Sequence, residues 1–98
     1  MKESSLSRKI RQHANDLPRT KCLKIHGNGL MEVGTPDLLV VQDGRTIWFE
    51  TKVGRNKPSK IQDKRLEQWR EAGAIAVAVY TLDDALDVLL GRGDWSRA

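Results

Sequence analysis

The spacing of apolar residues predicts where the chain forms its first helix and its first strand. Leu6, Ile10 and Ala14 recur every fourth residue, which places them on one face of an α-helix. A proline follows soon after, and proline is common just beyond a helix end. We therefore expect a helix over about residues 3–16. Polar and apolar residues then alternate over residues 21–26, a spacing typical of a half-buried strand.

Two further strands are expected on either side of a tight turn. Residues 37–42 and 46–53 are rich in β-branched and aromatic side chains, which favour strands. Asp43 and Gly44 lie in the gap between them. This pair is a strong hairpin signal, because both central residues of a type I′ turn have positive φ. The pattern therefore predicts a two-residue hairpin.

The second half of the chain predicts a helix, a strand and a short helix, over residues 59–72, 74–80 and 81–90. Ser59 and Gln62 have the spacing of a capping box, in which two residues satisfy each other's backbone N–H groups. The hairpin strands are apolar on both faces, and such a sheet needs cover on both. The 98 residues therefore predict one α/β domain. We expect a mixed central sheet flanked by helices, in the order α-β-β-β-α-β-α.

The hairpin register brings three chemically active residues to one end of the sheet. If Asp43 and Gly44 form the turn, counting back from them sets Asp37 opposite Glu50. Directly opposed residues share a face of the sheet, and Lys52 lies two residues beyond Glu50 on that face. The pattern therefore places two carboxylates and an amine together at a strand end.

Two opposed carboxylates repel each other unless a cation lies between them. One alternative is a frayed strand end with charged residues, and another is an ordinary ion pair between Lys52 and Glu50. The apolar strands around the two acids argue for partial burial, which favours a cation partner. Mg²⁺ often binds one or two carboxylates, and a neighbouring lysine can stabilise developing negative charge. These are the requirements of phosphodiester hydrolysis.

The charge of the chain favours a polyanionic partner, since its net charge is +4. Basic residues crowd the segment just after Lys52: Arg55, Lys57, Lys60, Lys64 and Arg65. The alternative is a solvated helix face next to a charged loop. We predict that the first four of these residues bind the backbone phosphates of a nucleic acid.

Three short motifs follow one another along the chain: Gly34-Thr35-Pro36-Asp37, then Glu50-Thr51-Lys52, then Ser59-Lys60-Ile61-Gln62. Together with an early helix that bears Glu3, they resemble the PD-(D/E)xK nuclease superfamily. Within it they resemble the virus-type replication-repair nuclease family, VRR-NUC. The resemblance runs over about residues 3–80 and implies a restriction-endonuclease-like core.

The resemblance implies a role for each residue of the central motifs. Asp37 and Glu50 look like ligands of a Mg²⁺ or Mn²⁺ ion, with the backbone carbonyl of Thr51 as a third ligand. Lys52 looks like the catalytic lysine. Thr51 departs from the family pattern, because a larger apolar residue is more usual there.

Other residues have competing interpretations. Gln62 looks like the family's helix glutamine, which touches the catalytic site, but it also has the spacing of a capping residue. Glu3 looks like the acid that completes the metal site, but an acid at a helix start is also favoured by the helix dipole. Lys24 and His26 are interpreted as a surface pair, with contact to phosphate as the alternative. Glu32 is interpreted as a solvated loop acid, with an extension of the acidic cluster as the alternative.

The resemblance implies a Mg²⁺- or Mn²⁺-dependent DNA endonuclease. The stand-alone members that the chain resembles come from phages and bacteria and look like Holliday-junction resolvases, which act as homodimers on branched DNA in repair. Two alternatives stay open. One is a non-catalytic DNA-binding module with a nuclease fold, and the other is a restriction-type endonuclease that reads a short sequence.

Composition excludes several other classes of protein. The single cysteine, Cys22, rules out a disulfide framework or a cysteine-based zinc site within one chain, and we expect it to be buried. The longest apolar run, residues 74–80, is shorter than the about 20 residues that a membrane helix needs. We therefore expect an intracellular protein, and the resemblance implies the cytoplasm of a bacterial or phage-infected cell and no small-molecule cofactor. Trp69 and Trp95 are candidates for the dimer interface.

Overall fold

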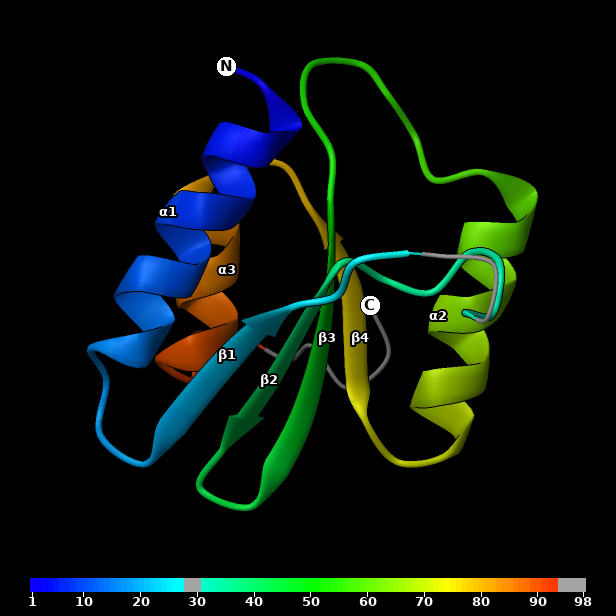
Figure 1. The fold of residues 1–98 in the computed structure, drawn as a ribbon. Helices are drawn as coiled ribbons and strands as arrows, with labels where there is room; N and C mark the ends of the chain where they lie inside the picture. The colour runs from blue at the N-terminus through cyan, green and yellow to red at the C-terminus, as the bar shows by residue number, and fades with distance from the viewer. Residues whose placement is uncertain (28–30, 94–98) are drawn as a thin grey trace.

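The computed structural model describes residues 1–27 and 31–93 and has its elements in the expected order (Figure 1). They are α1 (Glu3–Asn15), β1 (Thr20–Lys24), β2 (Leu38–Gln42), β3 (Arg45–Thr51), α2 (Lys60–Glu71), β4 (Ile75–Val79) and α3 (Leu82–Leu89). β3 ends at Thr51 rather than at residue 53, because the paired part of β4 ends opposite it at Val79. No helix in the described ranges has the length and apolar character needed to cross a membrane.

The four strands form one mixed sheet in the order β1-β2-β3-β4. β2 is antiparallel to both of its neighbours, whereas β3 and β4 are parallel. The turn from β2 to β3 has the predicted two-residue form, with φ of 49° at Asp43 and 82° at Gly44. Leu38 consequently pairs with Phe49, which is the register that this turn predicts.

Helices cover both faces of the sheet, α1 and α3 on one face and α2 on the other (Figure 1). The sheet residues buried with α1 and α3 include Leu38, Val40, Ile47 and Phe49. Leu66 of α2 packs against Trp48 and Ala76 on the opposite face. Burying each large apolar side chain contributes about 2 kcal/mol to stability. The side chains of the neighbours Ile47 and Trp48 therefore point to opposite faces of the sheet, as the alternation of a strand requires.

Asn15, at the end of α1, closes part of the outer edge of the sheet. Its side-chain NH₂ donates to the Cys22 carbonyl at 3.1 Å, and its side-chain oxygen accepts from the Cys22 N–H at 2.8 Å. These contacts occupy backbone groups of an edge strand that would otherwise be open to another chain. Cys22 is buried as expected, and burial raises the pKa of its thiol to about 11. It is therefore a poor nucleophile.

One end of the sheet gathers the segments that carry the motifs. The parallel strands β3 and β4 have their carboxyl ends there, as does the segment that leads from β3 to α2 (Figure 1). The first residues of α1 lie at the same end. Residues far apart in the sequence are therefore brought to one edge of the sheet.

Candidate active site

Asp37 is held at the entrance to β2 by contacts from several segments. The segment before it turns at Gly34, where φ is 85° and an added Cβ would lie 3.0 Å from Ile61 of α2. Glycine permits both this backbone conformation and the close approach. The Asp37 backbone carbonyl accepts from the Ile25 N–H at 2.8 Å. Its carboxylate oxygens accept from the N–H and the hydroxyl of Thr51 at 2.7 and 2.8 Å, which fixes Asp37 to the end of β3.

Lys24, the last residue of β1, also contacts Asp37. Its Nζ lies 3.0 Å from Oδ2 of Asp37, and both side chains are partly buried. The sequence pattern favours a surface pair of Lys24 with His26 and does not predict this ion pair. The signal that could have found it is the β1–β2 register, which sets Lys24 opposite Leu38, the residue after Asp37. A long connecting segment leaves that register undetermined from sequence.

Glu50 is the one fully buried carboxylate in the described part of the chain, with 5% of its surface exposed. Its Oε2 lies 3.5 Å from Nζ of Lys52 and 3.5 Å from Nε2 of Gln62. Burial raises the pKa of the Glu50 carboxyl to about 7, and the neighbouring charge of Asp37 adds to the rise, while Lys52 opposes it. The local positive charge is therefore too small to hold Glu50 fully ionised, and a further cation would be stabilised here.

Gln62 serves both the helix and the site. Its side-chain oxygen accepts from the Ser59 N–H at 2.9 Å, and the Ser59 hydroxyl accepts from the Gln62 N–H at 3.2 Å. The predicted capping box is therefore present. The NH₂ end of the same side chain donates to Glu50. Because an amide has separate acceptor and donor ends, the two interpretations of Gln62 are compatible, and the cap directs the donor toward the carboxylate.

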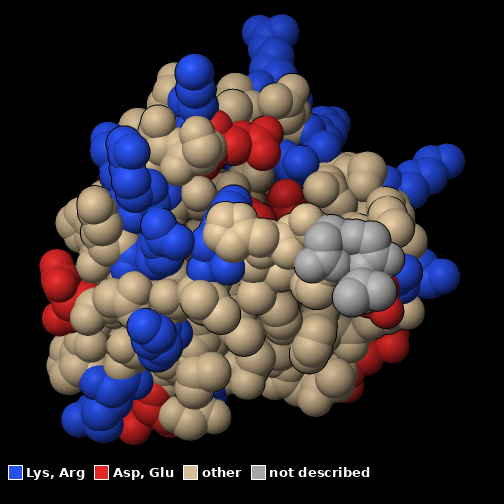
Figure 2. Space-filling view, viewed as in Figure 1, with Lys and Arg blue, Asp and Glu red and all other residues tan. Residues whose placement is uncertain are grey.

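Asp37 and Glu50 line one cavity of about 500 Å³, together with Gln62 and Glu32. The two acids therefore meet in one place, as the hairpin register predicts. Figure 2 shows acidic atoms recessed in the upper part of the molecular face in view, with Lys and Arg side chains around them. A polyanion approaching the recess would meet positive charge first.

Glu3 begins α1, and its charge adds slightly to the raised pKa of Glu50. The acid of the first helix is therefore within electrostatic reach of the site. Over residues 1–27 and 31–93, no three His, Cys, Asp or Glu side chains gather closely enough to form a metal site. The carboxylates available to a cation are Asp37 and Glu50, while a ligand role for Glu3 or for the Thr51 carbonyl stays a prediction.

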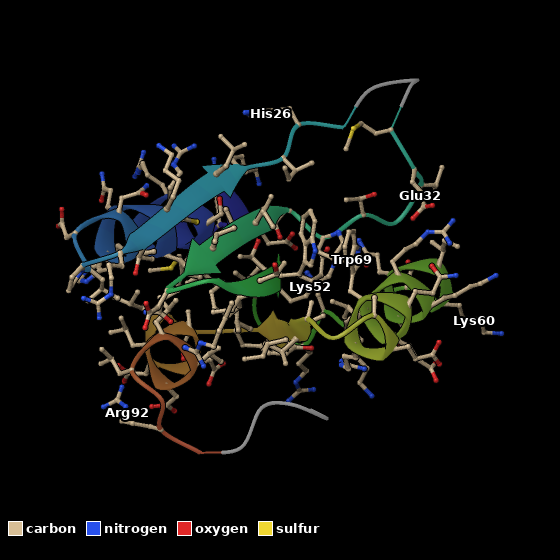
Figure 3. The ribbon with its side chains drawn as sticks, turned by 90° about the horizontal axis from the view of Figure 1, so that it is seen from below. His26, Glu32, Lys52, Lys60, Trp69 and Arg92 are labelled. Atoms are coloured by element: carbon tan, nitrogen blue, oxygen red, sulfur yellow. The ribbon has the colours of Figure 1, made fainter. Side chains whose placement is uncertain are left out.

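The four predicted DNA-binding residues are exposed: Arg55, Lys57, Lys60 and Lys64. Figure 3 shows Lys60 projecting outward from α2, whereas Lys52 lies toward the middle of the molecule. The Lys52 side chain is only 12% exposed. Lys60 is thus placed to contact a ligand from the protein surface, whereas Lys52 is placed to act inside the site.

Arg65 of α2 has structural contacts that set it apart from the exposed Lys60 and Lys64. Its guanidinium lies 2.9 Å from Oε1 of Glu32 and donates to the Val33 carbonyl at 2.9 Å. These bonds tie the segment before Asp37 to α2. Glu32 is therefore an ion-pair partner that lines the cavity, rather than a freely solvated acid.

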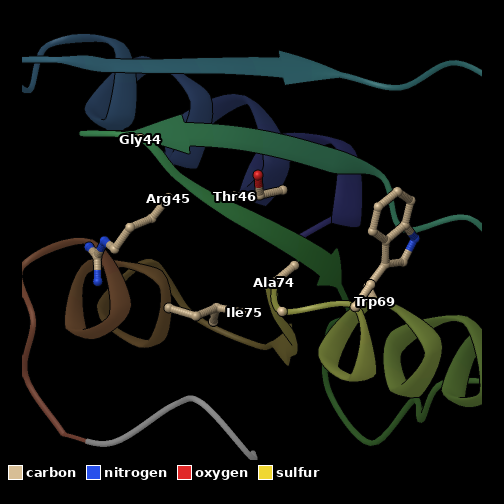
Figure 4. A pocket seen from close by; sticks show the side chains of 8 residues that line it. Gly44, Arg45, Thr46, Trp69, Ala74 and Ile75 are labelled. Carbon is tan, nitrogen blue, oxygen red and sulfur yellow. The ribbon is translucent and has the colours of Figure 1, made fainter.

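A second cavity, of about 380 Å³, lies at the start of β3 beside Trp69 (Figure 4). Arg45 and Thr46 line it, and no carboxylate does among the described residues. Trp69 packs against Trp48 with ring centroids 4.8 Å apart, and Trp48 is buried. Trp48 therefore belongs to the core under α2, with the partly buried Trp69 packed against it, and Trp95 lies outside the described residues.

The raised pKa of Glu50 predicts that the metal-free protein loses stability as pH rises. Unfolding returns the carboxyl to a pKa near 4.5, so between about 4.5 and 7 the unfolded state ionises first. The free energy of unfolding should fall across this window by up to about 3 kcal/mol. Glu50→Gln should remove that loss, so it should stabilise the protein at pH 8 much more than at pH 5.

Urea unfolding at both pH values in a chelator measures this effect. Glu67→Gln, which removes an exposed carboxylate of α2, is the matched control and should leave the pH dependence of the parent unchanged. If the free energy of unfolding depends equally on pH in the parent and in Glu50→Gln, Glu50 does not have the raised pKa.

Comparison with known proteins supports the fold. No protein-family model and no curated protein matches the sequence. A solved structure described as a VRR_NUC domain matches with a TM-score of 0.76 and 24% sequence identity, covering 94% of this chain and 97% of that chain. The match therefore includes nearly the whole length of each chain. The chain therefore has the fold of a VRR_NUC domain, as the resemblance of its motifs predicts.

Proposed function

We propose that the chain is a metal-dependent DNA endonuclease of the VRR-NUC type. The observation that carries the proposal is the shared cavity of Asp37 and Glu50, with the Lys52 amine 3.5 Å from Glu50. The likeness of the fold to a VRR_NUC domain supports it. A basic rim around recessed acids also fits a phosphate-bearing ligand (Figure 2).

The donor atoms of the site suit Mg²⁺ or Mn²⁺. Asp37, Glu50 and the backbone carbonyl of Thr51 would hold the ion, with Glu3 as an outer acid, and oxygen ligands of this kind are those that hard cations prefer. The raised pKa of Glu50 fits this role, because a buried carboxylate short of positive charge gains most from a cation. When bound, such an ion activates water and neutralises charge on a phosphodiester. Nothing in this chemistry needs a small-molecule cofactor.

Lys52 supplies a fixed positive charge beside the carboxylates. Its N–H donates to the Val79 carbonyl at 3.0 Å, so its backbone is tied to β4. Its side chain is largely buried and reaches Glu50. An ammonium group held in this way can donate hydrogen bonds to a phosphate oxygen as negative charge develops on it.

Lys24 and Gln62 are positioning residues in this proposal. Lys24 balances the charge of Asp37, and Gln62 directs a hydrogen bond to Glu50 from a capped helix start. Each acid thus has a partner from a different element, β1 for Asp37 and α2 for Glu50.

We propose branched DNA as the substrate, with a four-way junction as the first choice and a homodimer as the active form. Cutting two strands symmetrically needs two sites, and one chain offers one carboxylate pair. Arg55, Lys57, Lys60 and Lys64 would bind backbone phosphates, which position DNA without reading its sequence. The surface near Trp69 is the proposed dimer contact, and the setting is the cytoplasm of a bacterial or phage-infected cell.

Cleavage of a synthetic four-way junction is the direct test. With Mg²⁺ or Mn²⁺ the protein should cut the junction faster than a linear duplex of the same arms, and a chelator should abolish cutting. Asp37→Asn and Lys52→Ala should each lower the rate by about 100-fold or more, because the first removes a proposed metal ligand and the second removes positive charge beside the reacting phosphate. Gel analysis of end-labelled strands measures both effects.

The rival functions give different results in the same assay. Tight binding with no cutting in either metal would contradict the nuclease proposal and favour a DNA-binding module. Cutting of one linear sequence as fast as the junction would favour an enzyme that reads sequence.

The two roles of Gln62 can be separated by comparing Gln62→Ala with Ser59→Ala. Both variants break the capping box, so each should lower the free energy of unfolding by about 1 kcal/mol. Only Gln62→Ala removes the donor to Glu50, so it alone should slow single-turnover cleavage, by roughly tenfold. Equal slowing in the two variants would show that Gln62 acts through helix stability alone.

A further inference from the structure

A second group of basic residues lies on α1 and β1, away from the loop and helix assigned to DNA. We call it the α1–β1 basic surface, and its members are Arg8, Arg11, Lys21 and Lys24. Arg8 and Lys21 are exposed, and Arg11 and Lys24 are partly exposed. Figure 2 shows Lys and Arg side chains gathered on the left of the view, where Figure 1 places α1 and β1. The sequence signal for it is weak, because its residues come from two separate segments.

The contact between Asn15 and Cys22 explains why these residues lie together. Arg8 and Arg11 are seven and four residues before Asn15, so helical spacing puts all three on one side of α1. Asn15 bonds to the edge of β1, which brings that side of the helix against the strand. Arg11 acts electrostatically on Cys22, the residue after Lys21, so this side of α1 lies near β1. The outer edge of the sheet therefore carries positive charge from one side of α1 and from both faces of β1, since Lys21 and Lys24 alternate across the strand.

Structural roles do not account for this charge. Arg70 donates to the Ala76 carbonyl, and Arg19 pairs with Asp43. By contrast, Arg8, Arg11 and Lys21 form no ion pair or side-chain hydrogen bond within residues 1–27 and 31–93. Lysines on an edge strand can serve to prevent strand pairing. That purpose does not explain Arg8 and Arg11, since they lie on the helix.

Lys24 joins this surface to the candidate active site, because it lies on β1 and contacts Asp37. The residues assigned to DNA lie on the other side, on α2 and the segment before it (Figure 1). The recessed acids therefore have positive charge on two flanks (Figure 2). One flank alone would suffice for a ligand that ends at the site, whereas a polyanion that continues past the site would use both.

We propose that the α1–β1 basic surface binds the phosphate backbone of DNA on the side of the cutting site opposite to Arg55, Lys57, Lys60 and Lys64. The inference rests on the proposed function and extends it to the shape of the substrate, which is DNA that continues on both sides of the cleaved bond. Asn15 occupies the outward backbone groups at Cys22, so an added strand is disfavoured as the occupant at that point.

Binding of labelled duplex and junction DNA in a chelator tests this without cleavage. The matched variants are Arg8→Gln and Lys9→Gln, which are exposed neighbours on α1. Each loses one positive charge, but the helix turns them about 100° apart. Arg8→Gln/Lys21→Gln should bind several-fold more weakly at low salt. Its slope of log affinity against log salt should be smaller by about 1.8, or about 0.9 for each lost phosphate contact.

Lys9→Gln should keep the DNA affinity and the salt slope of the parent, and circular dichroism should show that all variants are folded. An unchanged salt slope in Arg8→Gln/Lys21→Gln would overturn the proposal, as would equal weakening by Lys9→Gln and Arg8→Gln. Failure of the parent to bind any DNA would overturn it too. A parent that binds through this surface but never cuts DNA with Mg²⁺ or Mn²⁺ would support the surface while contradicting the proposed nuclease.

Discussion

Repulsion between two carboxylates in a poorly solvated place is the constraint on which the rest of the structure depends. Asp37 and Glu50 line one cavity, and Glu50 is almost fully buried. Burial and the charge of Asp37 both raise the pKa of Glu50. Such an arrangement costs folding free energy, so the surrounding elements must hold the acids in place. Lys24, Thr51, Lys52 and Gln62 do so, through contacts from β1, the end of β3 and α2.

The fold tolerates this cost in free energy because apolar side chains are buried on both faces of the sheet. The hairpin strands contribute Leu38, Val40, Ile47 and Phe49 to the core under α1 and α3, and Trp48 to the core under α2. The acids come where these apolar strands end, so they are partly screened from water without entering the centre of the core. A cation at this point would offset the repulsion that the fold tolerates. Stability given up at the site is thus linked to the proposed function.

Much of this could be predicted from sequence because the decisive signals are local. The Asp43-Gly44 turn sets the hairpin register within a few residues, and the Ser59–Gln62 spacing marks the start of α2. The ion pair of Lys24 with Asp37 could not be predicted, since it depends on how β1 aligns across a long connecting segment. The double use of Gln62 depends on where the helix start lies relative to Glu50. Both features depend on tertiary contacts, which the spacing of residues along the chain does not determine.

Titration of the protein with Mn²⁺ tests the central claim most directly, because it measures the cation that the two acids are proposed to share. The account predicts binding that is about tenfold weaker at pH 6 than at pH 8, since Glu50 must lose a proton with a pKa of about 7. It also predicts that Asp37→Asn loses this binding. No binding at either pH, or equal binding by the parent and Asp37→Asn, would contradict the account.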